Sequence, residues 1–205
     1  MKITIIVEGK TEKAFIPYLR KYLEVRLRGE MPNLDPFPYD GRIPTQDKLR
    51  RIVRRLLENR SRPADHVIAL TDVYTGSQPP DFVNAVEAKS KMSQWVGNEP
   101  RFHPHAAQYD FEAWLIPYWE TIQRLAGHNK AAPEGYPESV NHNNPPASRI
   151  KEIFRTGRCR NHYVKPRDAG RILRDNDLSA AVLVCSELKA LINTILSVCG
   201  AAIIP

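Results

Sequence analysis

Two apolar runs that each end in a carboxylate constrain the fold of this chain most. The run Ile3–Val7 is followed by Glu8. The run His66–Thr71 is followed by Asp72. Short apolar runs of this kind are typical of buried strands, and ligands of open α/β sheets bind at the carboxyl ends of the strands. We therefore expect Glu8 and Asp72 to meet at one sheet edge, where two carboxylates suit Mg²⁺.

The rest of the chain alternates strands with amphipathic helices, which favours a doubly wound α/β fold with a mostly parallel sheet flanked by helices. The expected strands cover residues 2–8, 36–40, 65–72 and 103–109. The expected helices cover residues 11–27, 45–60, 81–96, 111–127, 146–155, 167–174 and 179–198. We expect Gly9 to permit a sharp exit from the first strand and Thr11 to cap the first helix.

The predicted elements group into three parts. Residues 1–127 form the α/β core, residues 128–148 form a long surface loop rich in Pro, Asn, Gly and His, and residues 149–205 form a helical C-terminal extension packed on the core. No stretch approaches the roughly 18 apolar residues of a membrane span, and no signal-peptide pattern is visible. The three cysteines form neither a zinc pattern nor a disulfide framework. We expect a cytoplasmic protein without a membrane partner.

The chain of 205 residues is basic, with a formal net charge of +7 and an isoelectric point of about 9.4. This charge favours a polyanionic partner such as nucleic acid. Cations gather on one face of the predicted helix 45–60 and in the turn 155–160, although a helix face of this kind is also compatible with simple solvation. The arginines expected to contact phosphates are Arg51, Arg54, Arg55, Arg158 and Arg160.

Four short motifs now carry a family resemblance. The stretch Val7–Glu12 resembles the first motif of the Toprim fold, which occurs in topoisomerases, primases and overcoming-lysogenization-defect nucleases. The chain as a whole resembles the small bacterial family called domain of unknown function 4276. That likeness rests on the order of four stretches: Val7–Glu12, Asp72–Gly76, Phe111–Leu115 and Pro146–Lys151.

The resemblance implies metal-dependent phosphoryl transfer. Toprim proteins usually carry Asp-x-Asp after the second of these strands, but here the second position is Tyr74. A phenol is a poor Mg²⁺ ligand because its pKa is near 10. Asp110 and Glu112 are candidates for the missing carboxylate, and the resemblance favours Glu112. The implied ligands of Mg²⁺ or Mn²⁺ are therefore Glu8, Asp72 and Glu112.

Further side chains receive expected roles beside this metal. Glu8 is an alternative general acid or base. Lys10 and Lys165 are the candidates for neutralising a bound phosphate, against the alternative that both are solvated. We expect Glu12 to be a surface acid that complements the helix dipole.

Two classes of function follow from these expectations. The first is a Toprim-like nuclease, a hydrolase of nucleic-acid phosphodiesters that acts in antiphage defence and is gated by an ATPase protein partner. The second is a non-catalytic module that uses the same cleft to bind nucleic acid or a partner. Tyr74 favours the second class, whereas Glu8, Asp72 and Glu112 favour the first. Nucleotidyl transfer of the primase kind is less favoured, because the chain shows no separate nucleotide-handling domain.

Overall fold

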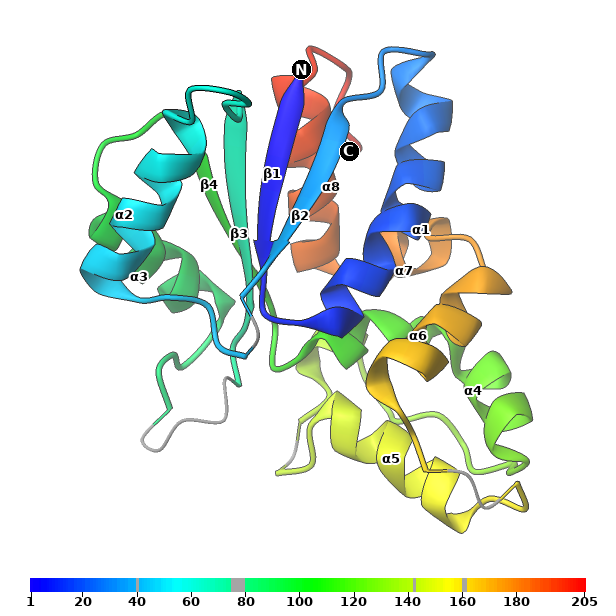
Figure 1. Ribbon diagram of the computed structural model, residues 1–205. Helices are drawn as coiled ribbons and strands as arrows, with labels where there is room; N and C mark the ends of the chain where they lie inside the picture. The colour runs from blue at the N-terminus through cyan, green and yellow to red at the C-terminus, as the bar shows by residue number, and fades with distance from the viewer. Residues whose placement is uncertain (40, 75–79, 142, 160–161) are drawn as a thin grey trace.

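Four parallel strands form a single sheet in a computed structural model that describes residues 1–39, 41–74, 80–141, 143–159 and 162–205 (Figure 1). The strands lie in the order β2-β1-β3-β4, and each neighbouring pair is parallel. Their bounds are β1 Lys2–Val7, β2 Asn33–Pro38, β3 His66–Asp72 and β4 Phe102–Ala107. The predicted parallel α/β sheet is confirmed.

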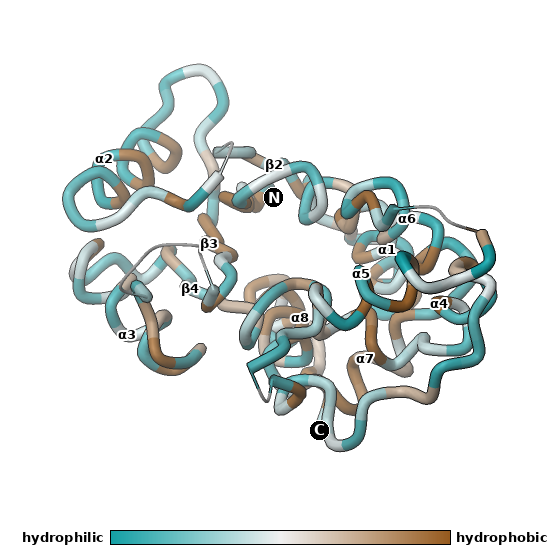
Figure 2. The backbone as a smooth tube through the Cα atoms, turned by 90° about the horizontal axis from the view of Figure 1, so that it is seen from below, coloured by the Kyte–Doolittle hydropathy of each residue, from teal (hydrophilic) through white to brown (hydrophobic). Residues whose placement is uncertain are grey.

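Helices cover both faces of this sheet. The α-helices are α1 Lys10–Leu27, α2 Gln46–Leu57, α3 Ala85–Val96, α4 Trp119–Ala126, α5 Pro146–Thr156, α6 Lys165–Arg174, α7 Ser179–Val184 and α8 Ser186–Val198. Two 3₁₀-helices, η1 Phe111–Tyr118 and η2 Pro137–Ser139, complete the described elements. Helices α2 and α3 lie on one face of the sheet, and α1 and α8 lie on the other (Figures 1 and 2).

The alternation of side chains along the strands explains this sandwich. Side chains on one face of the sheet pack with α1 and α8 in the larger core, namely Ile3, Ile5, Val7, Ile68 and Leu70. Side chains on the other face pack with α2 and α3, namely Ile6, Val67, Ala69 and Phe102. Because both faces are covered, the central strands β1 and β3 are apolar almost throughout, as expected for a parallel sheet.

Several predicted boundaries were wrong. The expected strand 36–40 begins at Asn33 and ends at Pro38, and it tolerates Pro36 because β2 is an edge strand. The helix expected from residue 81 begins at Ala85, because the Asn84 side chain accepts the Glu87 amide and caps it there.

Two predicted single helices are each divided in the structure. The stretch 111–127 is a 3₁₀-helix followed by α4, and Pro117 lies at the junction, where it cannot donate an amide to the preceding turn. The stretch 179–198 breaks at Cys185, whose extended backbone and full burial separate α7 from α8.

The start of α1 also differs from the prediction. Gly9 is the N-cap residue, and its extended backbone is one that any residue adopts. The Glu12 carboxylate accepts the Gly9 amide at 2.9 Å, so Glu12 rather than Thr11 satisfies the helix start. Glu12 is only 7% exposed, which corrects its prediction as a surface acid.

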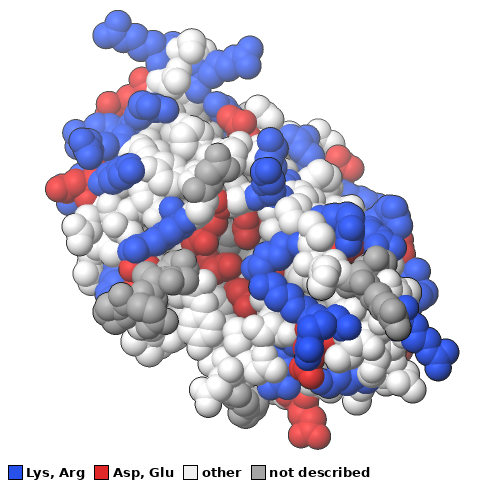
Figure 3. Space-filling view, turned by 60° about the horizontal axis from the view of Figure 1, so that its bottom comes forward, with Lys and Arg blue, Asp and Glu red and all other residues white. Residues whose placement is uncertain are grey.

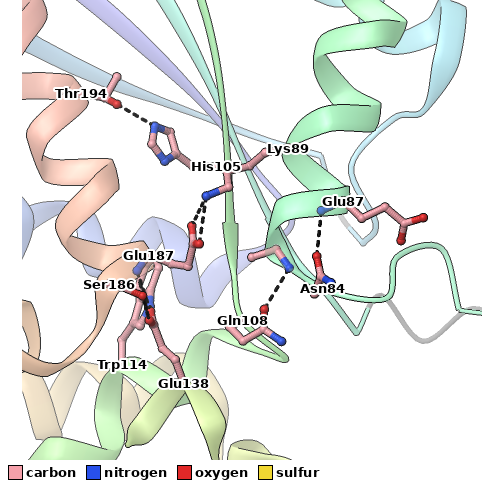
Figure 4. A network of polar contacts seen from close by, with 11 residues as sticks. Asn84, Glu87, Lys89, His105, Gln108, Trp114, Glu138, Ser186, Glu187 and Thr194 are labelled. Atoms are coloured by element: carbon pink, nitrogen blue, oxygen red, sulfur yellow. Dashed lines mark hydrogen bonds and ion pairs between the residues drawn. The ribbon is translucent and has the colours of Figure 1, made fainter.

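A polar network ties the outer layers together around the open edge of β4 (Figure 4). Lys89 of α3 and Glu187 of α8 form an ion pair at 2.6 Å. Glu138 of η2 accepts the Glu187 amide, the Ser186 hydroxyl and the Trp114 indole N–H. The long connection before α5 is thereby fixed to the first turn of α8. No described helix is long and apolar enough to cross a membrane.

Candidate functional site

The site begins where the direction of chain winding reverses. The chain passes from β1 outward to β2 and then returns across β1 to β3. Neighbouring strands that are connected in opposite directions leave a crevice at their carboxyl ends, and ligands of doubly wound folds bind there. Glu8 directly follows β1, and Asp72 is the last residue of β3.

Glu8 and Asp72 are in contact across this crevice. One carboxylate oxygen of Glu8 accepts the Asp72 amide at 3.2 Å and also accepts the Thr71 hydroxyl. Asp72 itself is only 9% exposed. The prediction that Glu8 and Asp72 lie at one sheet edge is confirmed, because parallel pairing of β1 with β3 places both strand ends together.

Three further buried acids stand near this pair. Glu12 lies in the first turn of α1, while Asp110 and Glu112 lie at the start of η1. Asp110 accepts the Ala147 amide with both oxygens, at 3.1 and 3.3 Å, and so holds the beginning of α5. Glu112 is completely buried.

Two residues from the C-terminal part bind the Glu112 carboxylate. The Lys165 ammonium contacts one oxygen of Glu112 at 3.0 Å, and the Tyr163 hydroxyl donates to the other at 3.2 Å. Lys165 is the first residue of α6, which is held against α1 by a hydrogen bond from Tyr18 to the Gly170 carbonyl. The alternative in which Lys165 is only solvated does not hold, because its ammonium is paired with the buried Glu112.

Burial, and after it the charges of neighbouring acids, raises the pKa of these acids. Burial, reinforced by the charge of Glu12, raises the pKa of Glu8 to about 7, although the Thr71 hydroxyl opposes the shift. Burial and then the charge of Glu8 raise the pKa of Asp72 well above its usual range. Burial and the charge of Glu112 raise the pKa of Asp110 to about 7. A site with these properties favours an added positive charge.

The pKa of Lys165 is raised as well, but for a lysine this favours the charged form. Burial lowers the pKa of Lys165, but the charges of Glu112 and Asp72 outweigh that effect and raise it. Lys165 is therefore a permanent cation among the acids. Figure 3 shows the carboxylates gathered in a hollow of the surface, with lysine and arginine side chains on both sides of it.

The described acids do not form a complete metal-binding site. Among the residues that the structure describes, no group of three or more His, Cys, Asp or Glu side chains is placed to hold a metal ion. Glu112 is already engaged by Lys165 and Tyr163, and Asp110 by α5. Lys10 is exposed in the first turn of α1, close in sequence to Glu8.

The predicted phosphate-binding arginines lie apart from these acids. Helix α2 runs back from the carboxyl end of β2 to the amino end of β3. Its last turn therefore lies at the amino ends of the strands, whereas Asp72 lies at the carboxyl end of β3. Beside this last turn of α2, a surface pocket of about 640 Å³ is lined by Arg51, Arg54, Arg55, Glu58, Asn59, Arg60 and Ser61. Arg158 is exposed beside another pocket, near Gly127, and Arg160 lies outside the described residues.

Sequence reasoning missed two members of the cluster. The sequence did contain a signal for Glu12. An acid at the third position of a helix can bend back and accept the amide of the N-cap residue, which here is the glycine after the strand. No sequence signal pointed to Tyr163. It lies 51 residues beyond its partner Glu112, and a single sequence does not reveal which phenol will approach which carboxylate.

Comparisons with known proteins agree with this arrangement. The structure is similar to the C-terminal region of the Burkholderia pseudomallei OLD protein, with a TM-score of 0.52 and 13% identity, over 96% of this chain and 98% of that one. This likeness shows the fold, and the predicted Toprim-like α/β class is confirmed. No curated protein matches the chain. The family model described as "Domain of unknown function (DUF4276)" matches residues 7–196, and the chain belongs to that family.

Proposed function

We propose that this chain is a metal-dependent nuclease that hydrolyses phosphodiester bonds of nucleic acid, with Mg²⁺ or Mn²⁺ at the crevice between β1 and β3. One observation carries the proposal: Glu8 and Asp72 are in contact at the switch point of a parallel sheet, and burial raises the pKa of both. Acids arranged in this way are stabilised in their charged form by a divalent cation.

The chemistry of the donors fits Mg²⁺ and Mn²⁺, which prefer carboxylate oxygens and water. Glu8 and Asp72 would hold the ion, and Glu112 would join them by exchanging its contact with Lys165. When bound, the ion polarises a phosphodiester and neutralises charge that develops on its oxygens. Tyr74 supplies no carboxylate at the position where Toprim proteins usually have one, so Glu112 is the third ligand in this proposal.

The chain's own residues supply the remaining chemistry. The pKa of Glu8, raised to about 7, suits a group that accepts or returns a proton near neutral pH. Lys165, kept charged by Glu112 and Asp72, would contact a phosphate oxygen. Lys10 is exposed at the positive end of α1 and is a second cation for that phosphate.

The proposal has a cellular part as well. We place the nuclease in antiphage defence, where an ATPase protein partner would gate its cutting. This part rests on the family resemblance of the four sequence motifs. Reconstitution with a candidate ATPase tests it: cleavage should depend on both the partner and ATP.

A second candidate function is a non-catalytic Toprim module that binds nucleic acid or a protein partner. The observation that favours it is Tyr74, together with the engagement of Glu112 by Lys165. Both leave Glu8 and Asp72 as the two acids at the strand ends, where the Glu8 carboxylate accepts the Asp72 amide.

Plasmid DNA and structured RNA, each incubated with Mg²⁺ or Mn²⁺, separate the two functions. The wild type should cut at least one of them, and Glu8→Gln and Asp72→Asn should each abolish cutting. Thermal stability of the metal-free variants should be unchanged or higher, because each substitution removes a repelling charge.

Glu134→Gln is the matched control, since Glu134 is an exposed acid on a distant loop. It should cut like the wild type. Equal cutting by all four proteins would reveal a contaminating nuclease. Absence of cutting by the wild type, with retained binding of the polymer, would establish the non-catalytic module instead.

A further inference from the structure

Two tyrosines lie side by side at the ends of the strands that flank the acids. Tyr74 follows β3 and Tyr109 follows β4, and their ring centroids are 5.4 Å apart at an angle of 40°. Tyr74 is 38% exposed, and Tyr109 is partly buried beneath it. The pair therefore presents part of an aromatic surface to solvent.

The backbone and a neighbouring loop fix this pair. The Tyr74 amide donates to the Tyr109 carbonyl at 2.7 Å, so the two chain segments continue the pairing of β3 with β4. Tyr109 has a φ of 69°, a left-handed conformation that is uncommon for a bulky residue and persists only where the surroundings enforce it.

The hydroxyl end of Tyr74 is held as well. The Asn141 amide group donates to the Tyr74 hydroxyl at 2.6 Å. Asn141 and Asn144 are themselves bound through their carbonyls by the Arg149 guanidinium of α5, at 3.5 and 3.0 Å. The Tyr74 ring is thus anchored at both ends, and Tyr74 is nevertheless 38% exposed.

The tyrosine pair is adjacent to the candidate site along the chain. Tyr74 lies two residues after Asp72, and Tyr109 immediately precedes Asp110. A phosphate held at the acids would therefore place the nucleoside attached to it within reach of the rings. Every nucleobase has an aromatic face, and aromatic side chains bind bases by stacking with little preference for sequence.

We infer that Tyr74 and Tyr109 form a stacking platform for an unpaired nucleobase next to the Glu8–Asp72 crevice, which makes single-stranded nucleic acid the substrate class of this site. The inference rests on the proposed nucleic-acid function and deepens it. Bases inside a duplex are already stacked and must be extruded before a protein can reach their faces. At position 74, a tyrosine that stacks on unpaired bases would then take the place of the metal-binding aspartate that Toprim proteins usually have.

Binding of matched oligonucleotides tests this inference. The probes are a single strand of about 12 nucleotides, a strand with the same phosphates but no bases, and the duplex of the first strand, in DNA and RNA forms. Ca²⁺ replaces Mg²⁺ so that the strands stay intact. The wild type should bind the base-bearing strand about 5- to 100-fold more tightly than the abasic strand and should prefer it to the duplex.

Two variants of Tyr74 form a matched pair. Tyr74→Phe keeps the ring and should keep the preference for bases. Tyr74→Ala removes the ring and should lower that preference severalfold or more, while affinity for the abasic strand stays unchanged. A 2-aminopurine base in the strand gives a second readout, because stacking on the ring should quench its fluorescence in the wild type and in Tyr74→Phe but less in Tyr74→Ala.

Equal wild-type affinity for the abasic and base-bearing strands would overturn the inference and leave the nuclease proposal standing if cutting occurs. A wild-type preference for bases without any cutting would support the inference and refute catalysis. If the wild type binds no probe, both proposals fail. If Tyr74→Ala does not fold, the wild-type preference for bases and the fluorescence quenching still test the inference. Tyr74→Leu then replaces the alanine variant and should lose the preference for bases, because leucine fills the space of the ring without offering an aromatic face.

Discussion

The ionisation of Glu8 links this site to folding stability. Its pKa is raised from 4.5 to about 7, chiefly by burial. An acid whose pKa is higher in the folded chain stabilises the fold below its unfolded pKa, and that contribution is lost as pH rises through the folded pKa. Glu8 should therefore lower the unfolding free energy of the metal-free protein by up to about 3 kcal/mol between pH 4.5 and 7.

Urea denaturation over this pH range measures the effect. The difference in unfolding free energy between Glu8→Gln and the wild type should grow in favour of the variant as pH rises. Glu134→Gln should track the wild type, because Glu134 is exposed. A constant difference across the range would show that the Glu8 carboxyl group titrates in the fold as it does in the unfolded chain.

Glu112 distinguishes a metal ligand from a purely structural acid. Glu112→Gln keeps the shape of the side chain but removes the charge that pairs with Lys165. As a ligand, Glu112 should be required for full Mn²⁺ affinity, so calorimetry of Glu112→Gln should show weaker binding and cutting should fall sharply. As a structural acid, its loss should cost on the order of 1–3 kcal/mol of unfolding free energy and leave Mn²⁺ affinity unchanged.

Tyr163→Phe is the control for this test. It removes the hydroxyl that donates to Glu112 and leaves both charges in place. It should destabilise the fold by about 1 kcal/mol without altering Mn²⁺ affinity. If Glu112→Gln binds Mn²⁺ like Tyr163→Phe does, Glu112 does not belong to the metal site.

Among the elements, α2 carries a cation cluster that does not adjoin the acids. Its exposed arginines line a pocket at the other edge of the sheet. If they contact phosphates, the Glu variants of Arg51, Arg54 and Arg55 should weaken binding of nucleic acid and should lower the slope of log affinity against log salt by roughly 0.7–0.9 for each lost contact.

A charge-matched control for α2 lies on the opposite layer. Reversal of Lys21, Arg28 and Lys189 changes the net charge of the molecule by the same amount. This control should lower affinity less and leave the slope nearly unchanged. If both triple variants lower the affinity and the salt slope equally, the α2 arginines contribute only through the net charge of the molecule and do not form a binding surface.

The strands were predictable because their pattern is local. The apolar runs before Glu8 and Asp72 specify β1 and β3, and the short connections between strands and helices force a parallel order. The breaks in the helices were not predictable in this way. The division at Cys185 depends on its packing in the core beside η1 and is not signalled by a glycine or a proline.

The candidate site was predictable only in part, for the same reason. Glu8 and Asp72 follow from strand ends, whose neighbourhood the topology dictates. The partners of Glu112 depend on how α6 packs against α1, which is a property of tertiary structure. The basic face of α2 was correctly predicted as exposed, but its distance from the acids follows only from the direction in which α2 runs.

At the scale of the whole molecule, the site joins parts that are distant in the chain. Glu8 directly follows β1 and Asp72 ends β3, whereas Lys165 comes from α6, 53 residues beyond its partner Glu112. Every piece must be folded before the acids assemble. A divalent cation that binds the assembled acids should therefore stabilise the entire fold, because the unfolded chain offers no comparable site.

This linkage gives a test that does not depend on cleavage. At a Mn²⁺ concentration of about 100 times its dissociation constant, binding adds about 2.7 kcal/mol, which corresponds to a rise of roughly 5–10 °C in the melting temperature for a chain of this size. The Glu8→Gln/Asp72→Asn double variant should start from an equal or higher melting temperature in the absence of metal and show little further rise, whereas Glu134→Gln should shift like the wild type. An identical shift in the double variant would place Mn²⁺ elsewhere on the surface and remove the metal from the β1–β3 crevice.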